Sequence, residues 1–206
     1  ISRYREMALQ PECEAAVDDI VNEAVVQEDE DSPVQLNLDR VEYGAGVKKK
    51  IHEEFANVCR LLDFSNYGTD IFKRWYVDGR LYYHNVIDPK NPQKGLLELR
   101  YVDPRNIKKV RKVKKGKDGE TNVSIFEDIE EYFVYNENGL SGADEGVKIT
   151  DDSITYCTSG LLDADRKQVL SYLHKAIKPL NQLRAVEDAT VIYRLSRAPE
   201  RRIFYV

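Results

Sequence analysis

Residue types that carry out chemistry are sparse in this chain, and its three histidines are the first to consider. His52 begins the stretch HEEF, which starts like the zinc-binding motif HExxH, but Ala56 stands where that motif needs its second histidine. His84 and His174 have no serine, cysteine or carboxylate at the spacing of a catalytic motif. All three are therefore interpreted as structural histidines.

Paired carboxylates and glycines are the next candidates for chemistry. Asp18-Asp19 and Asp151-Asp152 are adjacent pairs, whose side chains point in different directions on a helix or strand, so solvated charge explains them better than acid–base catalysis. The stretch Tyr43–Gly46 lacks the Lys-Ser/Thr of a phosphate-binding P-loop. The sequence thus predicts a protein that is not an enzyme and needs no cofactor or metal. A hydrolase with an unrecognised site is one remaining alternative.

Composition narrows the class of protein. Of the 206 residues, 33% are charged and 42% are hydrophobic, as in an ordinary globular chain, and the length suits one domain with an extension. Cys13, Cys59 and Cys157 lie far apart without CxxC spacing, which predicts neither a disulfide framework nor a zinc site. Charges interrupt each apolar stretch before the roughly 20 residues that a membrane span requires, so no membrane insertion is expected.

Charge is strongly segregated along the chain. Nine acids and no basic residue lie between Glu12 and Asp31, whereas seven basic residues and no acid lie between Ile107 and Lys117. The basic run could form a nucleic-acid patch, but Ile107, Val110 and Val113 interleave it, as in an edge strand that lysines keep soluble, followed by a hairpin turn. A sequence-independent nucleic-acid-binding module that uses Lys108–Lys117 therefore stays as the alternative function.

The elements that position these residues indicate an α+β fold. Helical spacing of apolar residues predicts helices over 11–26, 47–64 and 67–76, the last of which ends at a turn formed by Asp78 and Gly79. Alternation of apolar and polar residues predicts a strand over 34–41. Further short segments, rich in aromatic and β-branched residues, predict a meander of antiparallel strands over 80–88, 96–103, 106–114, 129–136, 147–152 and 153–159.

The C-terminal segment predicts one long, projecting helix. Asp165 with Gln168 resembles a capping box, and Pro199 disfavours helix at Ala198, which gives a helix of about 33 residues or about 50 Å. Pro179 in its interior predicts a kink one turn earlier. A compact domain of this size cannot cover such a helix, so neighbouring copies or a returning segment must do so. The apolar stripe includes Leu173, Leu180, Leu183 and Leu195.

Several stretches resemble a known protein family. Leu96–Val113, with the sequence LLELRYVDPRNIKKVRKV, and above all Leu170–Val206 resemble the portal proteins of T4-like tailed phages, and Leu81–Leu96 is similar in style. The resemblance extends over nearly the whole chain, although members of the family are considerably longer. It implies a structural subunit of a twelve-subunit ring at one vertex of the phage capsid.

The resemblance also implies a domain organisation. Residues 1–163 would form the wing domain, 164–199 the first stem helix and 200–206 the first strand of the clip domain, with the second stem helix and the crown missing. The stem residues expected at the subunit interface are Leu173, Pro179, Leu180, Leu183 and Leu195. The cations that could face the channel are Lys178, Arg184, Arg194 and Arg197.

Partners follow from the same resemblance. They are other copies in the ring, the large terminase subunit, major capsid and scaffold proteins, neck or head-completion proteins, and double-stranded DNA that passes through the channel during packaging and ejection. The separate terminase hydrolyses ATP, whereas the portal catalyses nothing. The expected location is the virion, at the portal vertex of the capsid, after assembly in the host bacterial cytoplasm.

Overall fold

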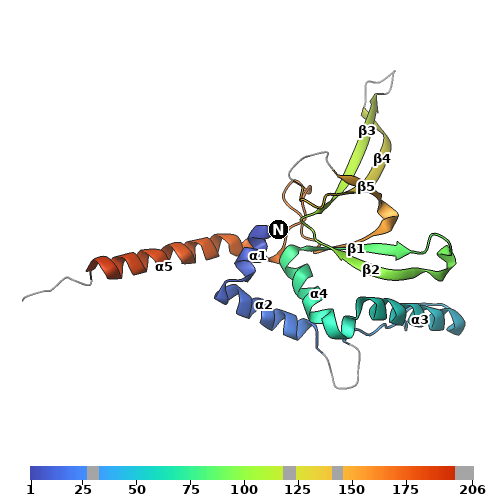
Figure 1. The fold of residues 1–206 in the computed structure, drawn as a ribbon, viewed down its shortest axis with the longest axis horizontal. Helices are drawn as coiled ribbons and strands as arrows, with labels where there is room; N and C mark the ends of the chain where they lie inside the picture. Colours follow the sequence, from blue (N-terminus) through green and yellow to red (C-terminus); the bar gives the residue numbers. More distant parts are fainter. Residues whose placement is uncertain (27–32, 118–123, 141–145, 198–206) are drawn as a thin grey trace, which may run out of the picture.

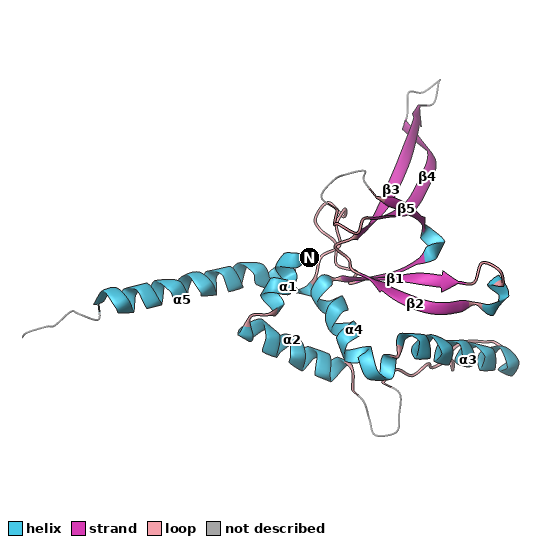
Figure 2. Cartoon of the chain, in the orientation of Figure 1, coloured by secondary structure: helices cyan, strands magenta, loops and turns pink. Residues whose placement is uncertain are grey.

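A computed structural model describes residues 1–26, 33–117, 124–140 and 146–197 of the chain. It confirms a mixed fold of helices and antiparallel sheets with a long helix near the C-terminus (Figure 1). Helices lie on one side of the body and strands on the other, and the last helix projects away from both (Figure 2). The predicted α+β class is therefore correct.

Four helices form the first part of the described body: α1 (Ser2–Ala8), α2 (Pro11–Ala24), α3 (Ala45–Leu62) and α4 (Phe64–Asp78). Pro11 is the first residue of α2, where a missing N–H costs nothing, and Glu12 and Glu14 lie in its positively polarised first turn. Gly79 ends α4 with a φ of 73°. The predictions for α2, α3 and α4 are confirmed, whereas α1 was not predicted.

Six strands form two three-stranded antiparallel sheets in the described residues. The first has the order β2 (Leu96–Val102), β1 (Arg80–Ile87), β6 (Ile154–Thr158), and the second has the order β3 (Ile107–Lys117), β4 (Ser124–Tyr135), β5 (Val147–Thr150). Each overlaps a predicted strand segment, and β3 and β4 extend beyond theirs. The expectation of a simple meander is wrong, because β6 returns to pair with β1.

Residues 34–41 do not form a strand, contrary to the alternation of their sequence. Val34, Leu36 and Leu38 are half-buried and the intervening Gln35 and Asn37 are exposed, so one side of the segment does pack. It packs beside α3, where Leu36 lines a hollow with Phe55 and the Leu38 carbonyl accepts a hydrogen bond of 3.0 Å from Lys48. The alternation of apolar and polar residues in this segment therefore reflects packing against α3 and not pairing with a strand.

Apolar side chains gather in two separate clusters. The helical core joins α1, α2 and α4 to the base of the C-terminal helix, and its buried members are Met7, Ala8, Cys13, Val17, Val21, Val77, Leu173 and Leu180. The sheet core lies between the two sheets, where Tyr82 meets Phe133 edge-on at 6.0 Å and stacks on Tyr156 at 4.7 Å. Its buried members are Tyr82, Ile107, Phe133 and Ile154.

The C-terminal helix starts later than predicted. It consists of a short 3-10 turn, η3 (Tyr172–Ala176), that leads directly into α5 (Ile177–Arg197). The predicted capping box of Asp165 and Gln168 is wrong, because these residues lie in a loop. In this loop the Asp163 N–H donates to the Gln168 carbonyl at 2.9 Å, and Arg166 has a left-handed backbone with a φ of 54°. Ser171 caps instead: its hydroxyl accepts a hydrogen bond of 3.0 Å from the Leu173 N–H.

Pro179 lies in the first turn of α5 and not in the middle of a longer helix. As the third residue of α5, it occupies the first turn, where backbone N–H groups lack helical partners in any case. The expected interior kink is therefore wrong, and the 21 residues of α5 give a length of about 30 Å instead of about 50 Å. The predicted stop at Ala198, the strand at Arg201–Val206 and the far part of the basic hairpin turn lie outside the described residues.

Candidate functional site

The base of α5 is built into the helical core. Leu173 and Leu180 are each 7% exposed and pack among α1, α2 and α4. Tyr172 stacks on Tyr76 of α4, with ring centroids 5.0 Å apart and planes 6° from parallel. Leu173 and Leu180 are thus covered by their own chain, and little of their side-chain surface remains for contact with a neighbouring copy.

A junction of hydrogen bonds surrounds the segment that leads into η3. The Ser171 side chain is fully buried and donates to the Tyr76 carbonyl at 3.2 Å. Ser159, which follows β6, donates its hydroxyl to the Leu170 carbonyl at 2.6 Å and its N–H to the Gly79 carbonyl at 2.8 Å. The end of α4, the start of β1, the end of β6 and the base of α5 therefore meet within a few residues.

Beyond this base, α5 is uncovered. Every residue from Asn181 to Arg197 is exposed, including six large apolar side chains. Val186 is 62% exposed, Ile192 66% and Leu195 72%. At about 100° per residue, these side chains lie on at least three sides of the helix. In the single chain, α5 therefore leaves large apolar side chains uncovered on several sides, with polar side chains between them. The exposed apolar residues are Leu183, Val186, Val191, Ile192, Tyr193 and Leu195.

The four cations of α5 point in different directions. Lys178, Arg184, Arg194 and Arg197 are all exposed, and helical geometry places them at least about 60° apart around the axis. Arg184 lies against its own chain, since the Gln10 side-chain oxygen, when turned toward it, accepts a hydrogen bond of 3.1 Å from Nε. Arg197 donates to the Tyr193 hydroxyl at 2.6 Å. The four cations cannot all face one channel.

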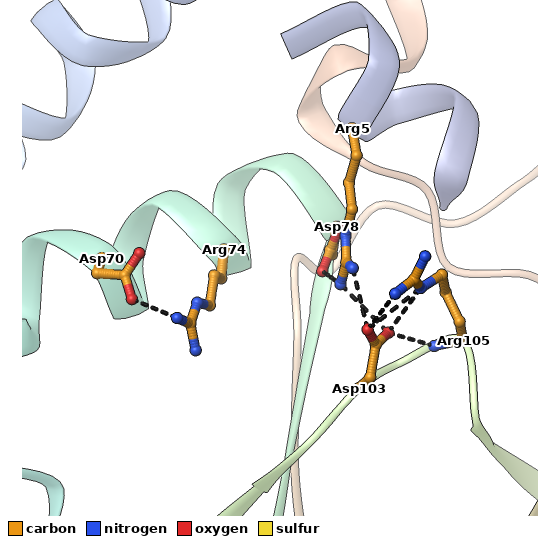
Figure 3. Close-up of polar contacts among 6 residues, drawn as sticks. All are labelled: Arg5, Asp70, Arg74, Asp78, Asp103 and Arg105. Carbon is orange, nitrogen blue, oxygen red and sulfur yellow. Dashed lines mark hydrogen bonds and ion pairs between the residues drawn. The ribbon is translucent and has the colours of Figure 1, made fainter. Parts of the chain in front are cut away.

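A second polar cluster joins the helices to the sheets (Figure 3). Arg5 of α1 donates from Nε and a terminal nitrogen to both oxygens of Asp78, at 2.9 and 2.6 Å. The same guanidinium donates to both oxygens of Asp103, at 3.0 and 3.2 Å. Arg105 also binds Asp103, with its backbone N–H at 2.9 Å and its side chain at 2.8 Å. Asp78 is 1% exposed, so its charge depends on Arg5.

The cluster changes the titration of its members. The hydrogen bond with Asp78 raises the pKa of the Arg5 guanidinium above its already high usual value. Burial alone would raise the pKa of the Asp103 carboxyl, but hydrogen bonds from Arg105 and Arg5 outweigh burial and hold that pKa well below its usual range. Burial raises the pKa of the neighbouring Tyr101 hydroxyl to about 12. The charged form of Asp103 is therefore favoured by folding.

We expect the stability of the chain to depend on pH through Asp103. Because its pKa is lower in the folded than in the unfolded state, its contribution is complete above the ordinary aspartate pKa of about 4 and is lost as the pH falls below that value. When the pH falls from about 6 to about 3, the melting temperature of the wild-type protein should decrease more than that of Asp103→Asn. Plots of melting temperature against pH for the two proteins should therefore converge at low pH. Parallel curves in thermal unfolding experiments would contradict this assignment.

The basic run forms β3, and acids neutralise part of it. Lys109 lies 2.8 Å from a carboxylate oxygen of Glu131 and 3.1 Å from one of Asp151, and Arg111 lies 3.3 Å from Glu131. The hydrogen bond with Glu131 raises the pKa of Lys109. These pairs cross from β3 to β4 and to the short turn that follows β5. The described part of the run therefore resembles an edge strand with paired charges more than an open surface for phosphates.

The other sequence candidates are dispersed. His174 shares a hydrogen bond of 2.7 Å with Tyr4, His52 lines the open hollow beside α3, and His84 lies on β1. Asp18 pairs with Lys73 of α4 at 2.5 Å. All three cysteines are free. Within the described ranges, His, Cys, Asp and Glu side chains do not gather into a group of three or more that could hold a metal ion.

Sequence reasoning did not find the Arg5 cluster. The sequence places Asp78 in a turn with Gly79, and it places Asp103, which precedes Pro104, at the end of a predicted strand. Arg5 belongs to α1, whose seven residues are too few to produce a clear amphipathic pattern. Nothing in the spacing of these residues along the chain indicates that they meet.

Membrane spanning can be assessed from the described helices. None of those helices combines the length and the apolar character that crossing a membrane requires.

Comparison with known proteins gives a consistent result over the whole chain. A family model described as "Bacteriophage T4-like portal protein (Gp20)" matches residues 1–206. The chain is similar to a curated portal protein of Vibrio phage KVP40, at 39% identity over 218 residues that cover 100% of this chain and 42% of that protein. It is also similar to a portal protein of Salmonella phage ViI, at 39% identity over 221 residues that cover 100% of this chain and 39% of that protein.

Proposed function

The chain belongs to the family of T4-like bacteriophage portal proteins, and from this premise we propose that it is a structural subunit of a twelve-subunit portal ring. In this role it would stand at one vertex of the capsid and form part of the conduit for double-stranded DNA during packaging and ejection. The chain spans about two fifths of the length of the two curated relatives, 42% and 39%, so the ring belongs to the longer protein.

The exposure of α5 is the observation that best supports this proposal. A helix whose large apolar side chains are 54–72% exposed over its last turns would be unfavourable in an isolated protein. A ring supplies the missing surface, because each subunit presents α5 to its neighbours. The firm anchoring of Leu173 and Leu180 in the helical core would then hold this helix at a fixed place in every subunit.

The proposed domain organisation follows the family and is adjusted by the elements observed. Residues 1–163 would be the wing domain, which contains both sheets and α1 to α4. The stem segment 164–199 would consist of a loop, η3 and α5, and residues 200–206 would begin the clip domain. Terminase and neck proteins would dock on the clip, and capsid and scaffold proteins would contact other parts of the ring. The proposed location is the virion, after assembly in the host bacterial cytoplasm.

The alternative function, a nucleic-acid-binding module that uses Lys108–Lys117, has less support. Lys109 and Arg111 both contact Glu131, which competes with phosphate for these cations. A conduit must also avoid tight binding, since a ring multiplies every Lys or Arg contact with DNA by the number of subunits.

We expect assembled rings to bind duplex DNA weakly and without sequence preference. Each phosphate contact releases counterions, so affinity should fall steeply as salt rises from about 50 to 200 mM. Fluorescence anisotropy with two unrelated duplexes, measured over this salt range, tests the prediction. Native mass spectrometry of the same sample determines the number of subunits. A protected sequence in a footprint, or binding by a monomer that persists at high salt, would favour the alternative function.

A further inference from the structure

The helical core and the sheet core share no buried residue, which raises the question of what fixes their relative orientation. The chain passes between them at Gly79, after α4, and returns through the segment 159–170 between β6 and η3. Because α5 is anchored in the helical core and the strands form the sheet core, the relative orientation of the two cores sets the angle of α5 relative to the sheets (Figure 1).

Arg5 is one of the side chains that link the helices to the sheets away from these chain crossings, together with Arg74 of α4, which lies 4.9 Å from the ring centre of Tyr101 in β2. Arg5 lies on α1, between Tyr4 and Met7, which pack in the helical core. Its Nε edge binds Asp78 at the end of α4, and its terminal edge binds Asp103 at the end of β2 (Figure 3). One guanidinium therefore forms two forked pairs at once, one on each side of the boundary.

Both carboxylates are held in place independently of Arg5. Asp78 is the last residue of α4 and is separated from β1 by Gly79 alone. Asp103 begins the turn between β2 and β3, where its carbonyl accepts from the Asn106 N–H at 2.9 Å and its side chain accepts from the Arg105 N–H at 2.9 Å. Because Ile107, the first residue of β3 directly after this turn, is 2% exposed in the sheet core, Asp103 moves with that core.

We propose that Arg5 is a positioning residue, which sets the orientation of α5 relative to the two sheets through its paired forks to Asp78 and Asp103. Only arginine has the planar donor geometry that satisfies two carboxylates along two edges, whereas a lysine ammonium offers one charged centre. Loss of the fork to Asp103 removes no residue of either core and breaks the charged link between them. The inference concerns the chain itself and does not depend on ring formation.

Distances between spin labels test this proposal directly. Labels are introduced as non-natural amino acids at three exposed positions, Glu23 of α2, Asp188 of α5 and Val147 of β5. Labelled subunits are diluted into unlabelled ones, so that the distances measured lie within one chain. The Glu23–Asp188 distance joins α2 and α5, which are both anchored in the helical core, whereas the Asp188–Val147 distance joins α5 to the second sheet.

Two variants break the link in different ways. Arg5→Lys keeps the positive charge but loses both forks, and Asp103→Ala leaves the buried Arg5–Asp78 pair intact. The matched control is Arg100→Lys, because Arg100 pairs at 3.1 Å with Glu98 of its own strand. We expect both test variants to broaden the Asp188–Val147 distribution at least about twofold or to shift its mean, with the Glu23–Asp188 distribution unchanged. The control should match wild type in both.

Three results would overturn the proposal. The first is an unchanged Asp188–Val147 distribution in either folded test variant. The second is an equal change in the Glu23–Asp188 distance, which would indicate a general loosening of the chain. The third is failure of both variants to fold, which would show that the cluster is needed for folding and not for orientation.

Discussion

Replacing Gly79 by alanine is expected to lower the free energy of unfolding of the chain by about 2–5 kcal/mol, the sum of a backbone cost of about 1–2 kcal/mol and a steric cost of about 1–3 kcal/mol. The φ of 73° at Gly79 lies in the left-handed region, which costs a residue with a Cβ about 1–2 kcal/mol. The added Cβ would also lie 2.6 Å from the Leu170 oxygen and 2.9 Å from the Ser171 Cα. Both are backbone atoms, so no rotamer change relieves the clash.

A second glycine separates the two costs. Gly160 has a φ of 76°, and a Cβ placed there meets nothing within 4 Å. Gly160→Ala should therefore cost only the backbone part, about 1–2 kcal/mol. Urea unfolding of both variants measures the difference. Equal losses of unfolding free energy in the two variants would show that the backbone at Leu170 and Ser171 moves away from the added Cβ at little cost. The junction at the base of α5 would then not be tightly packed.

Strands and most helices could be predicted from the sequence because their patterns reflect local packing. In β1, Leu81 and Tyr82 are buried and Ile87 is exposed, and aromatic residues such as Tyr83 still mark the segment as a strand. The pairing of β6 with β1 could not be predicted, because alternation identifies strands but not their neighbours. The same limit explains residues 34–41, where a helix supplied the covering surface.

The start of the C-terminal helix differs from the prediction because of local hydrogen bonds around Ser171. Apolar spacing starts at Val169 and continues through Leu173 and Ala176, but Ser171 offers a cap, and Asp163 and Gln168 pair through their backbones in a loop. Capping and loop closure therefore make the helix start later than the predicted Asp165. The Arg5 cluster was out of reach for a different reason, because its members are separated by 73 and 98 residues.

The predicted stem stripe divides into two classes. Leu173 and Leu180 stabilise the chain itself, while Leu183, 39% exposed, and Leu195, 72% exposed, remain available to neighbours. An assembly test that uses Leu180 would therefore mix two effects, because placing a charge in the helical core costs several kcal/mol of folding stability. A clean test needs positions that the chain leaves uncovered.

Replacing Ile192 and Leu195 together by aspartate is expected to abolish ring formation while the wing stays folded. Both side chains are exposed in the single chain, 66% and 72%, so the substitutions remove no internal contact. In a ring, each large side chain that becomes buried contributes about 1.5–3 kcal/mol, and a buried aspartate adds a desolvation cost. These losses recur at every subunit contact. Light scattering coupled to size exclusion should then show monomers with a melting temperature close to that of wild type.

The matched control is Gln182→Asp with Ser196→Asp, which adds the same negative charge to exposed polar positions of the same helix. Both double variants lower helix propensity by similar small amounts and add the same two negative charges, so they differ mainly in the apolar surface lost. The control should still form rings, since polar side chains at a rim contribute little to association. Rings formed by the Ile192 and Leu195 variant would show that the exposed face of α5 is not buried in assembly, and rings lost in both would assign the effect to charge.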